Sequence, residues 1–196
     1  MSMNTPNKLT IGRMIATPIF MATLLIDFPY HYLVSLVLFI AASLTDMIDG
    51  QMARKHNLIT NFGKFLDPLA DKMLTTAAFL GFIAMGKVCW QVTWIVFIVL
   101  FREFLISSLR LVTVSSGGKV VAANMWGKSK TVTQMLGIIF ALFAYVIMED
   151  FGIQNEVLTT VFYVANSVIL WVSAALCVIS GVIYLAACKE YIDPSK

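Results

Sequence analysis

The sequence predicts an all-α, polytopic membrane protein, and three observations lead to this fold class. Hydrophobic residues make up 59% of the 196 residues and charged residues only 13%, whereas soluble domains contain about 25% charged residues. The apolar residues gather in six stretches that approach the ~20 residues needed to span a bilayer. The basic residues concentrate on one side of these stretches. On this composition the chain does not resemble a water-soluble enzyme, a disordered regulator or a nucleic-acid-binding module. Its net charge of only +3 is also too small for a polyanion binder, so we expect no nucleic-acid partner.

Polar or turn-forming residues bound the apolar stretches. The first stretch ends before Asp27 and Pro29, and the second follows directly. The third starts with the polar segment NFGKFLDPLADK and finishes with the apolar segment MLTTAAFLGFIAM. The fifth and sixth contain almost no ionisable group, and the sixth is long enough to tilt or to extend past the membrane surface. The six predicted spans are about residues 9–26, 30–54, 61–85, 90–114, 128–148 and 157–188. Short connections and the lack of an internal repeat predict that residues 1–196 form a single membrane domain.

The distribution of basic residues predicts the orientation of the chain. If the N-terminus is inside, the outer turns contain Lys87 as their single basic residue, together with the acidic Asp27, Glu149, Asp150 and Glu156. All other lysines and arginines then lie at inner ends. Cytoplasmic loops carry an excess of Lys and Arg, so six transmembrane helices with both termini in the cytoplasm are expected.

An acidic motif occupies the predicted cytoplasmic ends of the second and third spans. It reads D-x2-D-G-x2-A-R-x8-G-x3-D-x3-D from residue 46 to residue 71. At 3.6 residues per turn, two sets of residues each share one helical face. These sets are Asp46, Asp49, Gly50 and Ala53 on the second helix, and Gly63, Asp67 and Asp71 on the third. The short return KHNLITNF makes the two helices antiparallel neighbours, so their four carboxylates can converge.

Four carboxylates at the membrane edge need positive counter-charge, because each costs about 2.5–3.5 kcal/mol on insertion scales. Nearby Lys and Arg side chains are one source, although Arg54 lies about 12 Å along the helix from Asp46. Bound divalent cations are the other source, and oxygen ligands without histidine favour two Mg²⁺ or Mn²⁺ ions over zinc. Simpler interpretations also remain open. Asp46 and Asp49 could be surface residues at a helix C-terminus, Asp67 could be an N-cap, and the small residues could serve close packing.

The motif resembles the signature of the CDP-alcohol phosphatidyltransferase family at every specified position. The resemblance implies that a phosphatidyl group passes from CDP-diacylglycerol to a hydroxyl acceptor and that CMP leaves. It implies two metal ions, one held by Asp46, Asp49 and Asp67 and the other by Asp46, Asp67 and Asp71. Asp71 would also be the general base. The residues that the resemblance assigns to CDP-diacylglycerol are Gly50, Ala53, Arg54, Thr60 and Gly63.

Three flanking segments bear on the acceptor. They are PNKLTIGR at residues 6–13, REFLISSLR at residues 102–110 and GKSKT at residues 127–131, and they resemble the branch of the family that uses glycerol 3-phosphate. A phosphate-bearing acceptor needs cations, and arginine binds phosphate through paired hydrogen bonds. The predicted acceptor-phosphate residues are Arg102, Arg110, Lys128 and Lys130. Thr10 and Arg13 are predicted to bind CDP-diacylglycerol. The alternatives are a local Arg102–Glu103 ion pair, lysines that only set topology, and capping or anchoring by Thr10 and Arg13.

Two other functions remain as alternatives. A sibling phosphatidyltransferase would use phosphatidylglycerol, serine or an inositol phosphate as its acceptor. A divalent-cation transporter would also place carboxylates in the membrane, but the sequence has no inverted repeat and no helix broken near the midplane. The family resemblance implies a bacterial inner-membrane enzyme that works among membrane lipids, with its active site facing the cytoplasm. Family members are often dimeric, so a homodimer is consistent with the resemblance.

Overall fold

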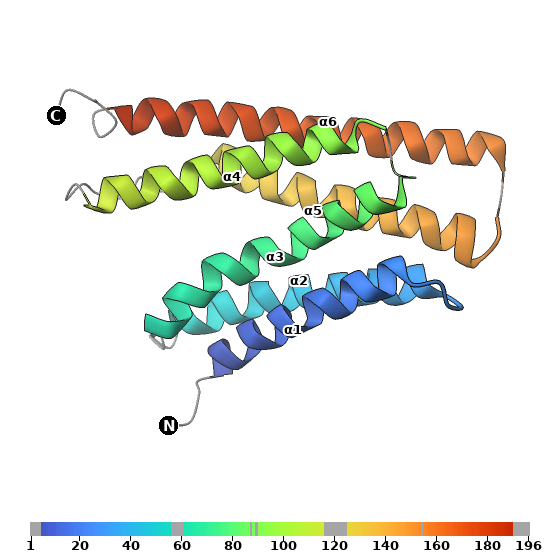
Figure 1. Cartoon of the computed structure of the whole chain (residues 1–196), viewed down its shortest axis with the longest axis horizontal. Helices are drawn as coiled ribbons and strands as arrows, with labels where there is room; N and C mark the ends of the chain where they lie inside the picture. Colours follow the sequence, from blue (N-terminus) through green and yellow to red (C-terminus); the bar gives the residue numbers. More distant parts are fainter. Residues whose placement is uncertain are drawn as a thin grey trace. The chain divides into compact units, whose positions relative to one another are not determined.

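The computed structural model describes residues 5–55, 61–86, 88, 90–115, 125–153 and 155–189. Within these residues the chain is helical and contains no strand (Figure 1). The elements are α1 (Thr5–Leu25), α2 (His31–Lys55), α3 (Asn61–Met85), α4 (Val92–Ser115), α5 (Met125–Tyr145), the π-helical turn η1 (Val146–Asp150) and α6 (Glu156–Ala187). The predicted all-α class is therefore confirmed.

The predicted stretches match these helices to within about one helical turn. The predicted bounds of the third span, 61–85, coincide with those of α3. The largest difference is at α1, which begins at Thr5 and not near residue 9. Pro6 fits this earlier start, because the first turn of a helix does not need the N–H that proline lacks.

Among the residues that the structure describes, three helical stretches are long and apolar enough to cross a membrane: Asn7–Leu25, Met125–Asp150 and Glu156–Ala187. His31–Thr45 and Lys72–Met85 are shorter apolar helices. They are parts of α2 and α3 whose side chains the structure describes, and they lie on either side of the acidic motif. The chain thus has the helices of a membrane protein. The count of six spans and the cytoplasmic position of both termini stay predictions.

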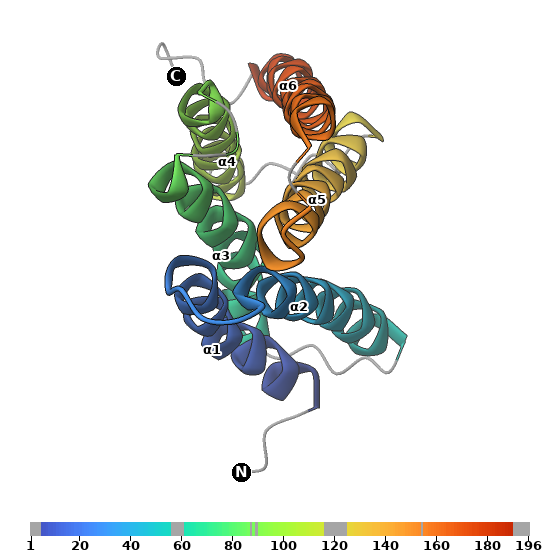
Figure 2. The same cartoon turned by 90° about the vertical axis from the view of Figure 1, so that its right-hand side faces the viewer.

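The chain divides into two compact units, and the first comprises Met1–Val88 and Ile138–Tyr163. In this unit α1 packs against both α2 and α3, and α2 also contacts α3 and η1. The three helices form one group in the end-on view of Figure 2. Buried aromatic residues fill the space between them, including Phe20, Phe39 and Phe82. A side chain at Gly81 would collide with Leu24, so the glycine lets α1 and α3 approach closely.

The second unit comprises Cys89–Gly137 and Val164–Lys196. It contains α4, the first part of α5 and most of α6. The buried face of α6 in this unit is rich in small and polar residues, listed in order as Asn166, Leu170, Ser173, Ala174, Cys177, Ser180, Gly181 and Tyr184. A Cβ at Gly137 would lie 2.8 Å from Leu170 Cδ2, so α5 and α6 are in close contact there. Hence this unit is held together by tight packing around a partly polar interior.

Candidate active site

The acidic motif lies on two continuous helices. Asp46 and Asp49 precede the C-terminal end of α2 at Lys55 by more than one turn. Asp67 and Asp71 both lie beyond the first turn of α3, which begins at Asn61. The N-cap interpretation of Asp67 is therefore wrong, because a capping residue precedes the first turn of its helix. An unbroken helix keeps the register that places each set of motif residues on one face.

The described part of the chain does not include the side chains of the motif. This applies to Asp46, Asp49, Gly50, Ala53, Arg54, Gly63, Asp67 and Asp71, and Thr60 lies outside the described residues altogether. Among the side chains that are described, no group of three or more His, Cys, Asp or Glu could hold a metal ion. The metal and nucleotide assignments of the motif thus stay predictions, supported by the helical register of α2 and α3.

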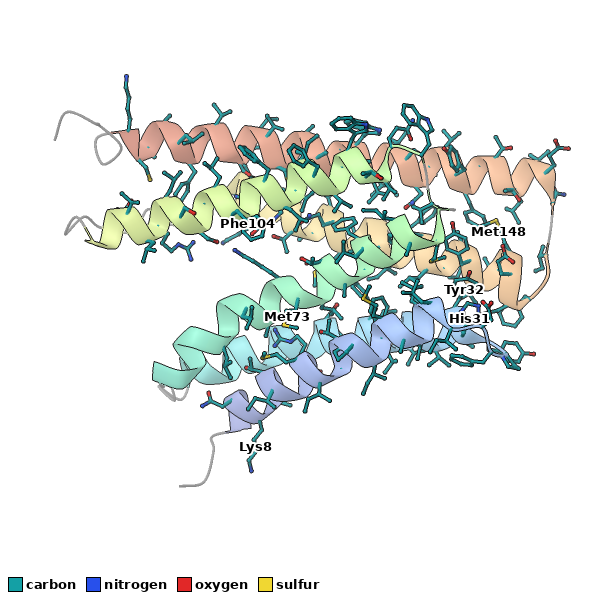
Figure 3. The ribbon with its side chains drawn as sticks, viewed as in Figure 1. Lys8, His31, Tyr32, Met73, Phe104 and Met148 are labelled. Carbon is teal, nitrogen blue, oxygen red and sulfur yellow. The ribbon has the colours of Figure 1, made fainter. Side chains whose placement is uncertain are left out.

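A buried polar face runs along α1. Asn7, Thr10, Arg13 and Thr17 recur every three or four residues, and their exposed fractions are 7%, 2%, 4% and 4%. The Thr17 hydroxyl donates a hydrogen bond of 2.9 Å to the carbonyl oxygen of Arg13. Lys8 is exposed and points away from α1 (Figure 3). The buried polar residues therefore lie on one side of α1 and do not surround its N-terminal end.

Thr10 and Arg13 lie on this face, on the helix that packs against α2 and α3. Thr10 is not a capping residue, because α1 begins at Thr5. Burial of an arginine in an apolar bundle is costly unless its charge is compensated. The acidic motif on the two neighbouring helices is a source of negative charge that the sequence offers. Asn7 and Thr17 were not predicted, although their spacing from Thr10 and Arg13 could have identified them.

A second polar cluster lies in the other unit and joins α4, α5 and α6. Glu103 Oε1 accepts a hydrogen bond from Arg102 Nη1 at 3.1 Å and another from Lys130 Nζ. Arg102 Nε donates to Ser180 Oγ at 3.2 Å. The side chains of Arg102, Glu103 and Lys130 are only 15%, 15% and 7% exposed. We call Arg102, Glu103, Lys130 and Ser180 the Glu103 network.

The four predicted acceptor residues thus fall into two pairs with different surroundings. Arg102 and Lys130 are brought together through Glu103, whereas Arg110 and Lys128 are exposed. The Arg102–Glu103 ion pair was considered from the sequence alone. The central position of Glu103 between two cations was not predicted. A signal for it existed, since a carboxylate within a mostly apolar helix needs a partner.

The far end of the first unit carries different polar contacts. Asp150 Oδ2 accepts a hydrogen bond of 2.7 Å from the backbone N–H of Leu33, in the first turn of α2. His31 Nε2 lies 3.8 Å from Asp27 Oδ1. His31 and Tyr32 lie at the opposite end of this unit from Lys8 (Figure 3). This end organises the start of α2 and does not contain the acidic motif.

Comparison with known proteins places these features in context. A family model described as CDP-alcohol phosphatidyltransferase matches residues 3–183. A Bacillus subtilis (strain 168) protein named CDP-diacylglycerol–glycerol-3-phosphate 3-phosphatidyltransferase is 38% identical over 205 residues, which cover 98% of this chain and 99% of that protein. A Rickettsia bellii (strain RML369-C) protein with the same name is 38% identical over 192 residues, covering 96% and 97%. An Arabidopsis thaliana protein, named with the suffix 2, is 38% identical over 147 residues, covering 70% and 63%. The family match includes the acidic motif and all three flanking segments.

Proposed function

The chain belongs to the CDP-alcohol phosphatidyltransferase family, and from that premise we propose that it transfers the phosphatidyl group of CDP-diacylglycerol to glycerol 3-phosphate. The products are phosphatidylglycerol phosphate and CMP. The main support for glycerol 3-phosphate as the acceptor is the near full-length similarity to bacterial proteins named for this reaction. The three flanking segments, which lie outside the acidic motif, favour the same acceptor.

The nucleotide end of CDP-diacylglycerol is assigned to the face of α2 and α3 that carries the small residues. Gly50 and Arg54 would hold the cytidine diphosphate group, and the small size of Gly50 and Ala53 would leave room for it beside the helix. Gly63 and Thr60 complete this set. Buried Thr10 and Arg13 on α1 support the assignment, because α1 packs against both motif helices. Asn7 and Thr17 extend the same polar face.

The donor set of the motif fits a hard divalent cation. Asp46, Asp49, Asp67 and Asp71 offer only carboxylate oxygens, and they occupy intact helices at spacings of three or four residues. Asp46, Asp49 and Asp67 would hold one Mg²⁺ or Mn²⁺ ion, and Asp46, Asp67 and Asp71 the other. When bound, such ions neutralise the charge that develops on the phosphoryl oxygens and the leaving group.

Asp71 is assigned the proton transfer. Its carboxylate accepts the proton of the acceptor hydroxyl, whose oxygen then bonds to the phosphorus next to diacylglycerol. The bond from that phosphorus to the bridging oxygen of the pyrophosphate breaks, and CMP leaves with the bridging oxygen. The new phosphodiester stays in the lipid. The acceptor phosphate is assigned to Arg102 and Lys130, with Arg110 and Lys128 as exposed cations that attract it.

The proposed setting is the bacterial inner membrane. The helices that are long enough to span a bilayer support a membrane location, and the excess of basic residues at the motif end supports a cytoplasmic active site. The lipid substrate would enter from the surrounding bilayer. A homodimer agrees with the family resemblance and is part of this proposal.

The test is CMP release by the purified protein in detergent with CDP-diacylglycerol and Mg²⁺. Glycerol 3-phosphate is compared with serine, an inositol phosphate and phosphatidylglycerol as acceptors. We expect release with glycerol 3-phosphate and background release with the others. Release only with another acceptor would keep the family chemistry and overturn the proposed acceptor. Folded protein that releases CMP with none of them would overturn the proposed function.

A further inference from the structure

The Glu103 network has an arrangement that ion pairing alone does not require. One carboxylate oxygen, Glu103 Oε1, accepts hydrogen bonds from cations on two different helices, Arg102 on α4 and Lys130 on α5. Ser180 on α6 holds the same guanidinium through Nε. The two cations are therefore fixed relative to each other by an acidic residue that carries no predicted role in the reaction.

Within the described contacts, the network leaves hydrogen-bond donors of its two cations unused. Nε and Nη1 of Arg102 are occupied, but Nη2 makes no hydrogen bond to any residue that the structure describes. An ammonium group has three protons to donate. In the described contacts, that of Lys130 donates only to Glu103. Among the described residues, two cations share one carboxylate in a mostly buried cluster. These features are those expected of a binding site for an anion.

We propose that Glu103 is a positioning residue for the acceptor phosphate: it holds Arg102 and Lys130 together so that their remaining donors bind one phosphate group. This inference rests on the proposed function for the identity of the acceptor. Without the carboxylate, the two buried cations repel each other strongly, because the interior screens charge poorly. Their side chains then separate, and the donors no longer meet on one phosphate.

The decisive variant is Glu103→Gln, which keeps the size of the side chain and removes its charge. We expect the KM for glycerol 3-phosphate to rise about tenfold while the KM for CDP-diacylglycerol changes less than about twofold. Glu103→Asp restores the charge and should recover part of the loss. Glu156→Gln, at an exposed position in the first turn of α6, is the matched control and should behave as the wild type does.

A combined variant tests whether Glu103 acts through Lys130. Lys130→Met alone should raise the KM for glycerol 3-phosphate, and adding Glu103→Gln should raise it little further, because the partner is already gone. Losses that multiply in the double variant would overturn the proposal. So would an unchanged or lowered acceptor KM in folded Glu103→Gln protein, because a lowered KM means that the carboxylate competes with phosphate.

A binding measurement separates this inference from the proposed function. Inorganic phosphate, added without CDP-diacylglycerol, should raise the Tm of the wild type and have a much smaller effect on Glu103→Gln. This result requires no turnover. Equal stabilisation of both proteins, or of neither, overturns the positioning role. Phosphate could stabilise the wild type more than Glu103→Gln although the wild type transfers no phosphatidyl group to glycerol 3-phosphate. In that case only the proposed acceptor is wrong.

Discussion

Arg13 shows most clearly how a single residue reflects the chemistry of its surroundings. It is 4% exposed on a helix whose other charged side chain, Lys8, is exposed. An arginine at such a position is unfavourable in an apolar bundle, so its burial indicates a ligand or an acidic neighbour. Buried Arg13 and exposed Lys8 can therefore be compared by substitution on the same helix.

Replacing Arg13 by Gln should raise the KM for CDP-diacylglycerol about tenfold, because the proposed charged contact to phosphate would be lost. The KM for glycerol 3-phosphate should stay close to that of the wild type. Lys8→Gln on the exposed side of α1 is the control and should change neither constant. Steady-state CMP release at varied concentrations of each substrate measures both values. Equal rises for the two substrates would contradict the nucleotide assignment.

Asp71 permits a second test at the level of one side chain. Asp71→Asn keeps the shape and removes the proton acceptor, so transfer should fall by about 10²–10⁴-fold. Binding of CDP-diacylglycerol should be largely kept, because the other three aspartates and the nucleotide residues remain. Single-turnover CMP release and equilibrium nucleotide binding report the two effects separately. Undiminished turnover would remove Asp71 as the base.

At the scale of whole elements, the helices follow from the sequence, but their lateral contacts do not. Long apolar runs and polar boundaries predicted α3 to the residue and the other helices to within about one turn. The acidic motif was likewise placed on two helices by spacing alone. The joining of Arg102 to Lys130 through Glu103 depends on how α4 and α5 are rotated about their axes, and periodicity does not specify that rotation.

The start of α2 is another contact that local sequence could not predict. Asp150 hydrogen-bonds the N–H of Leu33 although the two residues are 117 positions apart. The N-terminal turn of a helix has N–H groups without intrahelical partners, and its dipole favours a negative charge. Asp150 therefore performs for α2 the role that a preceding Ser or Asp performs in many helices.

Asp150→Ala should lower the free energy of unfolding by about 1 kcal/mol, the usual cost of losing a helix cap. Asp150→Asn keeps an oxygen acceptor and should lose less. The neighbouring exposed Glu149→Ala is the control. Denaturant-dependent unfolding in detergent, followed by circular dichroism, measures the differences. A loss in Glu149→Ala as large as that in Asp150→Ala would show that general charge and not capping is responsible.

At the scale of the whole molecule, polar residues are concentrated where chemistry is proposed. The acidic motif and the polar face of α1 belong to one compact unit, and the Glu103 network belongs to the other. The side chains of the four aspartates of the motif lie outside the described part of the chain. Their number and register, and the membership of the family, are the reasons to expect divalent cations.

Chelation tests this expectation on the intact protein. EDTA should abolish CMP release, and Mg²⁺ or Mn²⁺ added in excess should restore it. Without cations, the negative charges of the four carboxylates would repel the negatively charged pyrophosphate. The Tm measured alongside distinguishes loss of metal from loss of fold. Full activity in the presence of the chelator would contradict the two-metal proposal.

The π-helical turn η1 makes the position of Asp150 sensitive to chain length. In η1 the N–H of Phe151 reaches back five residues, to the carbonyl oxygen of Val146, so this turn holds one residue more than an α-helical turn. Each residue of an α-helix advances the next by about 100° around the axis. A deletion of one residue here would restore regular pitch and swing the Asp150 carboxylate away from α2. Thus the cap depends both on the aspartate and on the winding of the helix that carries it, and a relative could keep the aspartate and still lose the cap.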